Sequence, residues 1–296
     1  MSTNVIGALL MMASMACFTI NDTFIKMTEG ALPLSQLLFL RGVLSTLFIT
    51  GLAIRLRGLR GRVHGQDWLW IAIRSCAEVA AAYFFISALL NMPIANITAI
   101  LQLLPLTVTL GAALFFREEI GWRRMLAIGL GFGGMLLIVR PGTEGFTIWS
   151  LYGIAAVGCV TLRDLATRKV SEQVPSVLVT LMSSVIMLLS FGSASLAVEW
   201  APLTPRLAGL IFASSLFIVG AYFFSVQVMR QGSIASIAPF RYSGLIWALV
   251  LGWLVFGEWP EALTLLGAAI IVGTGLFTIY RERKLAADEL RAETRP

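Results

Sequence analysis

Two arginines, Arg41 and Arg241, stand inside long apolar stretches and have no acidic residue three or four positions away. A guanidinium group keeps its proton under nearly all conditions, so its burial requires a carboxylate, backbone carbonyls or a bound anion. Its fork of N–H donors fits the two oxygens of a carboxylate or a phosphate. We therefore predict that both arginines bind an anionic solute; the alternative is pairing across helices with Asp22, Glu78 or Asp164.

Three pairs of opposite charge have four-residue spacing, which places both members on one helical face. They are Asp22 with Lys26, Arg74 with Glu78, and Asp164 with Arg168. We predict that all six residues serve gating or coupling. The first and third pairs suit two gates, or helix ends whose side chains reach the lipid headgroups. The second is either a locally neutralised pair or a proton-coupling site at Glu78.

Uncharged side chains supply weaker candidates for the same site. Asn96, Gln102 and Tyr242 can direct hydrogen bonds toward a solute, and Tyr83 and Trp247 can stack on a planar ring. We predict substrate contacts for all five. The alternatives are packing in the core, exposure to lipid, or helix-to-helix hydrogen bonding.

Prolines and glycines within the apolar stretches suggest where helices bend and approach one another. Pro105 and Pro239 can kink their helices and free backbone carbonyls, so we predict hinges there. Gly-x-x-x-Gly at residues 129–133 and Ala-x-x-x-Gly at 269–273 predict a close approach of two helices, within the chain or in a homodimer.

The chain lacks the residue patterns that are typical of metal sites, disulfide frameworks and common catalytic or nucleotide-binding motifs. The chain has one histidine, and Cys17, Cys76 and Cys159 lie far apart, so we predict neither a metal site nor a disulfide framework. It contains no H-E-x-x-H, G-x-S-x-G or phosphate-binding G-x-x-x-x-G-K-[ST] segment. We predict that the protein is not an enzyme and uses no cofactor. A membrane-embedded enzyme and a non-catalytic scaffold or sensor are the competing interpretations.

The elements that position these residues follow from composition. Of 296 residues, 58% are apolar and only 13% are charged, against about 25% charged in a soluble domain. Ten membrane helices of about 20 residues would use roughly 200 residues and leave short loops. The net charge of +6 does not indicate a nucleic-acid partner, because the positions of the basic residues follow membrane topology.

Apolar stretches between charged, Gly and Pro breaks predict five spans followed by five more. They cover residues 5–27, 34–54, 68–90, 94–116 and 122–139, and then 148–169, 175–198, 207–229, 234–256 and 262–280. If the N-terminus is cytoplasmic, 16 of the 22 Lys and Arg lie at cytoplasmic ends and only Lys26, Arg140 and Arg206 lie outside. Both termini are therefore predicted to be cytoplasmic. No basic residue precedes the first span, so we expect it to remain as a helix rather than be cleaved as a signal.

The two halves resemble each other when shifted by 140 positions. Ile-Ala-Asn-Ile at 94–97 then aligns with Ile-Ala-Ser-Ile at 234–237, and Phe-Arg-Glu at 116–118 with Phe-Gly-Glu at 256–258. Since each half has an odd number of spans, the repeats must be inverted in the membrane, as in many secondary transporters. We predict an all-α integral membrane protein with ten transmembrane helices in two inverted five-helix repeats: residues 1–140, 141–280, and a charged cytoplasmic tail at 281–296.

These features resemble the EamA family of the drug/metabolite transporter superfamily. The resemblance is carried by Leu-Phe-Phe-Arg-Glu at 114–118, Leu-Val-Phe-Gly-Glu at 254–258, and glycine-rich fifth and tenth spans. Residues 39–42 and 238–242 are similar to a branch that contains riboflavin, S-adenosylmethionine and organic-anion carriers. One departure is that Pro105 has no proline partner at position 245.

The resemblance implies a carrier in the bacterial inner membrane. Together with the embedded arginines, it predicts alternating-access transport of a small organic solute that is anionic, carries a carboxylate or phosphate, or has a planar ring. The expected partners are this solute and the lipid bilayer. A coupling proton or counter-solute and a homodimer are left open.

Overall fold

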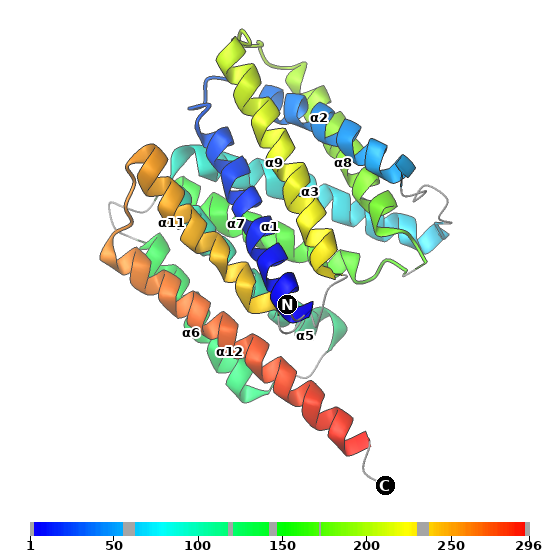
Figure 1. The fold of residues 1–296 in the computed structure, drawn as a ribbon, viewed down its shortest axis with the longest axis vertical. Helices are drawn as coiled ribbons and strands as arrows, with labels where there is room; N and C mark the ends of the chain where they lie inside the picture. The colour runs from blue at the N-terminus through cyan, green and yellow to red at the C-terminus, as the bar shows by residue number, and fades with distance from the viewer. Residues whose placement is uncertain are drawn as a thin grey trace.

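The computed structural model describes residues 3–55, 63–117, 121–141, 147–171, 173–229 and 237–293. These parts form helices and contain no strand (Figure 1). The elements are α1 (Thr3–Lys26), α2 (Leu34–Arg55), α3 (Gly65–Asn91), α4 (Ile94–Leu101), α5 (Leu104–Phe116), α6 (Trp122–Val139), α7 (Ile148–Thr167), α8 (Ser176–Ser195), α9 (Pro205–Met229), the 3₁₀ segment η2 (Ala238–Tyr242), α11 (Ser243–Phe256) and α12 (Ala262–Glu293).

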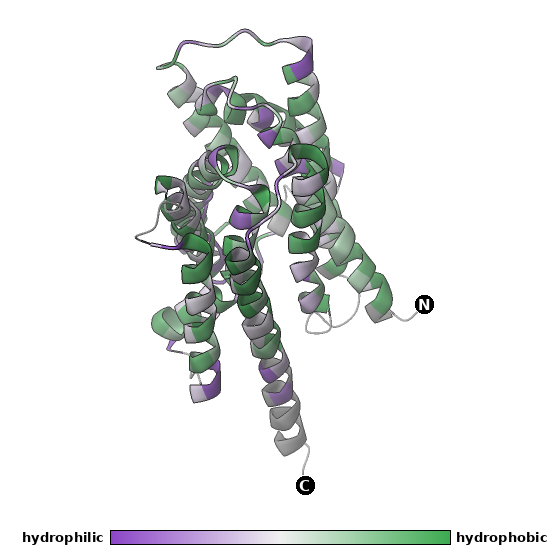
Figure 2. Ribbon diagram, turned by 90° about the vertical axis from the view of Figure 1, so that its left-hand side faces the viewer, coloured by the Kyte–Doolittle hydropathy of each residue, from purple (hydrophilic) through white to green (hydrophobic). Residues whose placement is uncertain are grey.

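Ten spans in the described part of the chain are long and apolar enough to cross a membrane, which confirms the predicted fold class. Figure 2 shows apolar residues along most of each helix, with hydrophilic residues at helix ends and at scattered positions within the bundle. Helices satisfy this requirement because each backbone N–H and C=O finds its partner within the same segment, where lipid offers none.

Two spans are interrupted, at the positions of the predicted hinges. The fourth span consists of α4 and α5, separated at Gln102 and Leu103, and Pro105 stands in the first turn of α5. Because proline has no N–H, the carbonyl of Leu101 loses its helical partner there. In the described part of the ninth span, the 3₁₀ segment η2, which contains Pro239, leads directly into α11. The tenth span ends at Arg281, next to the predicted end at Tyr280, and its helix α12 continues through the tail to Glu293, since the tail is rich in good helix formers.

The closest helix pairs each join one repeat to the other. The four pairs are α1 with α9, α3 with α7, α2 with α8, and α6 with α12 (Figure 1). By their order in the repeats, α1 corresponds to α7, α2 to α8, α3 to α9, and α6 to α12. The α1–α9 and α3–α7 pairs are therefore equivalent to each other, and each of the other two pairs joins a helix to its own counterpart. The core lies between the repeats, where Ile94, Ile97 and Ile100 of α4 are fully buried.

The ends of α5 and α11 confirm the similarity of the repeats at the level of the backbone. Arg117 and Gly257 follow these helices at equivalent positions, and both are left-handed, with φ of 57° and 66°. Such a residue ends a helix by directing the chain away from the helical path. Glu118, the acid of the first copy of this motif, lies outside the described residues.

The glycine-based contact of α6 with α12 has a different register from the predicted one. Added Cβ atoms at Gly129, Gly133 or Gly273 would meet nothing within 4 Å. The close approach instead uses Gly134 and Gly267: a Cβ on Gly267 would collide with the carbonyl oxygen of Gly134. The predicted close approach of these two helices is confirmed, but other glycines mediate it, because the spacing of small residues does not determine which helical face turns toward a partner.

Candidate functional site

A central cavity of about 530 Å³ lies among α1, α2, α3, α7, α8, α9 and the η2 segment. Seven charged side chains line it: Asp22, Arg41, Arg74, Glu78, Arg163, Asp164 and Arg241. Both arginines predicted to bind the solute therefore face one cavity, although they come from different repeats. Four of the six predicted gating or coupling residues face it too, and four cations there stand against three acids.

Part of this charge forms a network centred on Glu78. Arg163 contacts Glu78 Oε1 at 3.2 Å and Asp164 Oδ1 at 2.9 Å, and Arg74 stands 3.7 Å from Glu78 Oε2. The last contact confirms the predicted pair on α3. Arg74 also hydrogen-bonds Ser183 of α8. The network thus joins three helices and neutralises most of its own charge, as a partly buried cluster requires.

Arg41 and Arg241 differ from this network. Among the described residues, neither makes a salt bridge or a hydrogen bond. Asp22 and Asp164 line the same cavity, but in the described structure no salt bridge joins either acid to Arg41 or Arg241. Two guanidinium groups therefore reach the cavity with unused donors.

Asp22 is the acid of the cavity that has no cation within salt-bridge distance in the described structure. It accepts a hydrogen bond from Nδ2 of Asn21 at 2.8 Å. The predicted Asp22–Lys26 pair does not form, because the Lys26 ammonium lies 2.9 Å from Glu258 instead. A partner distant in the sequence thus replaces the one expected from helical spacing.

Uncharged residues complete the wall. Gln102 is buried and lines the cavity, as predicted. The aromatic lining differs from the predicted one and consists of Phe18, Phe85 and Tyr222. The rings of Phe18 and Tyr222 meet edge to face at 5.7 Å.

Sequence reasoning left Arg163 and Tyr222 out of the site. Arg163 was available as an embedded charge next to Asp164. Nothing in the local pattern marks Tyr222 among the many aromatics of its helix.

Four residues predicted to contact the solute lie outside the lining of the cavity. Tyr83 is 43% exposed and packs with Phe84 and Tyr152. Asn96 and Trp247 are half-buried; the Asn96 side-chain oxygen and the Trp247 ring nitrogen are buried atoms that have no partner in the described structure. The structure does not bring these residues into the lining of the cavity, because the rotation of a helix about its axis depends on its neighbours.

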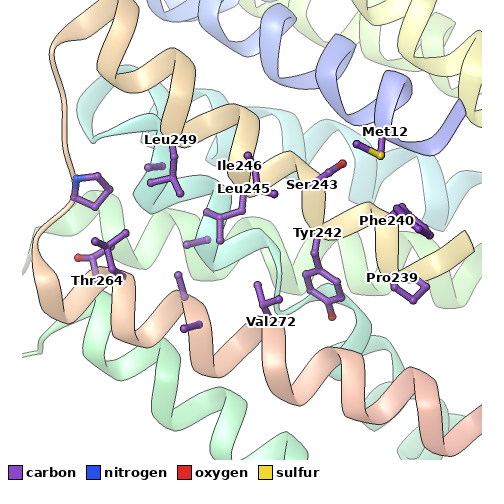
Figure 3. Close-up of a pocket in the computed structure, with 16 residues that line it drawn as sticks. Met12, Pro239, Phe240, Tyr242, Ser243, Leu245, Ile246, Leu249, Thr264 and Val272 are labelled. Atoms are coloured by element: carbon purple, nitrogen blue, oxygen red, sulfur yellow. The ribbon is translucent and has the colours of Figure 1, made fainter. Parts of the chain in front are cut away.

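Tyr242, the fourth of these, lines a separate groove between α11 and α12, which we call the lateral groove. Figure 3 shows the ring of Tyr242 pointing from η2 toward α12, near Val272. The groove has a volume of about 550 Å³, similar to that of the cavity, but its described lining is almost wholly apolar and carries no charge. Charge, rather than volume, therefore identifies the central cavity as the candidate site.

A cluster that we call the latch joins the C-terminal ends of α1, α3 and α11. It consists of Lys26, Met92, Ile94, Phe256 and Glu258. The Lys26 ammonium donates a hydrogen bond to the Met92 carbonyl at 2.6 Å, lies 2.9 Å from Glu258, and sits 5.3 Å from the centre of the Phe256 ring. The backbone N–H of Ile94 donates to Glu258 at 3.2 Å. The latch holds the repeats together at one end of the cavity.

Two further ion pairs join the two repeats at the same end of the bundle. Arg140 pairs with Glu261, and Arg206 lies 3.3 Å from Glu29. Arg168, a predicted gating residue, is at the opposite end, where it is exposed and caps α7. Contacts between the repeats at that opposite end include Ser171, whose N–H donates to Asp67 at 2.9 Å.

Known proteins resemble this chain over most of its length. The EamA-like transporter family model matches residues 5–140 and again 147–280. An S-adenosylmethionine uptake transporter of Rickettsia bellii is 29% identical over 67% of this chain and 68% of its own. The pseudopaline exporter CntI of Pseudomonas aeruginosa is 25% identical over 90% and 93%, and a riboflavin transporter of Vibrio cholerae 27% identical over 78% of each.

A solved crystal structure has the same fold. It superposes with a TM-score of 0.59 and covers 94% of this chain and 98% of its own, at 16% sequence identity. At that identity the likeness concerns the fold alone.

Proposed function

The chain belongs to the EamA-like transporter family, and from this premise we propose that it is a secondary carrier that binds a small anionic organic solute between Arg41 and Arg241. The observation that carries the proposal is the pair of arginines in one cavity without salt bridges in the described structure. A carboxylate or phosphate would complete their hydrogen bonds through bidentate contacts. A scaffold or sensor would leave this arrangement without a use.

The two ends of the cavity support alternating access. The latch closes one end, while the lining extends at the other end to Thr167, the exposed last residue of α7. In an inverted repeat, exchange of the two conformations opens the latched end and closes the other. Pro105 and Pro239, at the interrupted spans, are the proposed hinges, and Arg168 is the proposed gating cation of the open end.

The distribution of basic residues supports a cytoplasmic position for both termini, in a bacterial inner membrane. The latch would then face the outside, and the described conformation would be inward-facing. We also propose that residues 1–140 and 141–280 act as the two moving repeats. Proton coupling through Glu78, exchange against a counter-solute, and a homodimer are parts of the proposal to be tested separately.

The decisive experiment is uptake by the purified protein in liposomes. The solutes are S-adenosylmethionine, riboflavin, nucleoside phosphates, and mono- and dicarboxylates, each with and without a pH gradient. We expect saturable uptake of at least one anionic or carboxylate-bearing solute, and none by empty liposomes. Uptake confined to solutes that carry neither a carboxylate nor a phosphate would contradict the proposed role of the arginines.

A further inference from the structure

The lateral groove exists because small residues form part of its lining. Four alanines, two from α4 and two from α12, stand where larger side chains would fill the space beside α11: Ala95, Ala99, Ala268 and Ala269. The described lining is almost wholly apolar and contains no charged side chain. Since a polar solute would lose its hydrogen bonds to water there, the groove is suited to a hydrocarbon.

The groove lies in the membrane-spanning part of the chain and opens toward the lipid. Its described lining on α11 and α12 belongs to the spans 238–256 and 262–281, except Pro260 just before the second. Two lining residues are exposed on the outer surface of the bundle, Phe240 by 40% and Ile246 by 62%. At this depth in a bilayer the surrounding medium is acyl chains rather than water.

The dimensions of the groove distinguish between an acyl chain and a second protein helix. Thr264 to Val272 of α12 extends about 12 Å, which is most of one leaflet of a hydrocarbon core about 30 Å thick. Over that length, the volume of about 550 Å³ corresponds to a width of roughly 7–8 Å. An α-helix with its side chains is about 10–12 Å wide and does not fit. A chain of methylene groups is narrower than a helix and does.

Tyr242 closes the end of the groove opposite Pro260. Its side chain is 6% exposed and points toward α12 (Figure 3). There it occupies a notch at Gly275, where an added Cβ would collide with the Tyr242 hydroxyl. The hydroxyl is a buried atom with no hydrogen-bond partner in the described structure. The position of this ring is therefore set by the shape of its surroundings, which include the groove.

The same residue connects the groove to the central cavity. Arg241, which precedes Tyr242 in the chain, lines the cavity. Both residues belong to η2, a 3₁₀ segment of five residues. The hydrogen-bond geometry of a 3₁₀ helix is poorer than that of an α-helix, so the packing of Tyr242 on α12 contributes to the position of η2 and of Arg241.

We infer that the lateral groove binds an acyl chain of a bilayer lipid, from the leaflet on the side of the latch, and that the bound chain packs on Tyr242 and holds η2 in place. The leaflet follows from Pro260, which lines one end of the groove and lies two residues after Glu258 of the latch. A chain in the groove gains van der Waals contacts that a chain on a flat helical surface lacks. The site is separate from the central cavity, and its test needs no transported solute.

Two substitutions on α12 form a matched pair. Ala269→Phe places a ring in the groove, because Ala269 belongs to its lining. Leu266→Phe adds a ring at a residue of the same helix that is 51% exposed and outside that lining. We expect only Ala269→Phe to exclude the acyl chain.

The experiment adds palmitoyl-oleoyl phosphatidylglycerol to the purified protein in glyco-diosgenin, a detergent that has rigid rings in place of a flexible chain. We expect the lipid to raise the melting temperature of the wild-type protein by about 2–4 °C and to slow hydrogen–deuterium exchange in η2. Leu266→Phe retains both responses and Ala269→Phe loses both. Phosphatidylethanolamine with the same chains should act like phosphatidylglycerol, and glycerol 3-phosphate should have no effect, because the groove contacts the chain.

A second measurement covers the case in which Ala269→Phe does not fold. A phosphatidylglycerol with a diazirine in its acyl chain is photolysed with the wild-type protein at a low ratio of lipid to protein. We expect the adducts to concentrate on groove residues such as Leu249 and Val272 rather than on the exposed Leu130 and Leu136 of α6. An even spread of adducts would overturn the inference, and so would equal responses in both variants or a response to glycerol 3-phosphate. Dissociation of a dimer by Ala269→Phe would assign the groove to a second copy and overturn it as well.

Discussion

The first helices of the two repeats, α1 and α7, have the same local structure and different charge. In both, a threonine hydroxyl bonds the carbonyl four residues earlier: Thr19 to Met15 at 2.9 Å, and Thr161 to Val157 at 2.8 Å. Three residues after each threonine stands an aspartate on the cavity wall. The residue before that aspartate differs, being Asn21 in α1 and Arg163 in α7.

This single difference determines what each helix can do. Arg163 neutralises Asp164 within its own repeat and ties it to Glu78, so that side of the cavity is a structural network. Asn21 can orient Asp22 and cannot neutralise it. The two helices thus have similar backbones and different roles: the aspartate of α7 is part of an ion-pair network, and the aspartate of α1 is not.

The C-terminal ends of the same helices show a second contrast. Lys26 lies over Phe256 and Lys169 over Phe116, 5.3 and 4.7 Å from the ring centres, at related positions of the two repeats. At the first end the lysine also holds Glu258 and the Met92 carbonyl. The C-terminal ends of α1 and α7 therefore share a contact between a lysine and an aromatic ring. The described ion pair with Glu258 is made by the lysine of α1.

The largest expected effect comes from removing either unpaired arginine. Arg41→Ala or Arg241→Ala should weaken solute binding by about 2–5 kcal/mol, roughly 30-fold to several thousandfold, because each loses a charge-assisted contact in a low-dielectric site. Liposome uptake and equilibrium binding measure the change. Arg206→Ala, which removes an exposed arginine paired with Glu29, is the matched control and should leave both unchanged. Equal effects of all three variants would exclude the assigned site.

Arg163→Gln tests the contrast between α1 and α7 directly. It leaves Asp164 beside an uncharged residue, as Asp22 is, and Glu78 with Arg74 alone. We expect the unfolding free energy to fall by about 1–3 kcal/mol, since charged hydrogen bonds in a partly buried network are lost. Thermal unfolding in detergent measures this effect. An unchanged melting temperature would show that the network contributes little to folding.

The packing of the last helices of the repeats, α6 and α12, should be separable from the chemistry of the cavity. Gly267→Ala places a methyl group against the Gly134 carbonyl and should cost about 1–3 kcal/mol of stability through overpacking. Gly273→Ala on the same helix meets nothing within 4 Å and serves as the control. If both variants unfold at the same temperature, α12 does not pack on α6 in this register.

The smallest effect is expected at the latch. Lys26→Met should shift the balance toward the conformation open at that end by about 1 kcal/mol, roughly fivefold, because a partly exposed ion pair contributes little. Labelling of Thr98→Cys by a membrane-impermeant thiol reagent, in a chain whose three native cysteines are replaced by serine, reports this shift. The charge exchange Lys26→Glu with Glu258→Lys should restore the original labelling rate, and unaltered labelling in Lys26→Met would show that the latch does not close that end.

Much of the site followed from the cost of burying charge. Arg41 and Arg241 were identifiable because a guanidinium group without a local acid is expensive in the membrane, and both line the cavity. The Arg74–Glu78 pair followed from helical spacing in the same way. Such arguments depend on residue type and local distance along one helix, which the sequence contains.

The three aromatic candidates lie outside the lining of the cavity for a common reason. Tyr83, Trp247 and Tyr242 are aromatic residues of apolar helices, where the core, the lipid and the cavity all accept a ring. Their placement depends on how far each helix is rotated about its axis, and that rotation is set by neighbouring helices. The register of the glycines on α6 and α12 was misjudged for the same reason.

The sequence by itself determined the ten spans, their arrangement as two repeats, and the presence of costly charges among them, because the hydrocarbon imposes these requirements on each segment separately. Only the tertiary structure decided which charges are neutralised. Lys26 pairs with Glu258 and Arg163 with Glu78, partners far apart in the chain, so Asp22, Arg41 and Arg241 are the groups left without a salt bridge in the described cavity. The physical reason is that ion pairing depends on distances of a few ångströms, and packing of the two repeats sets those distances.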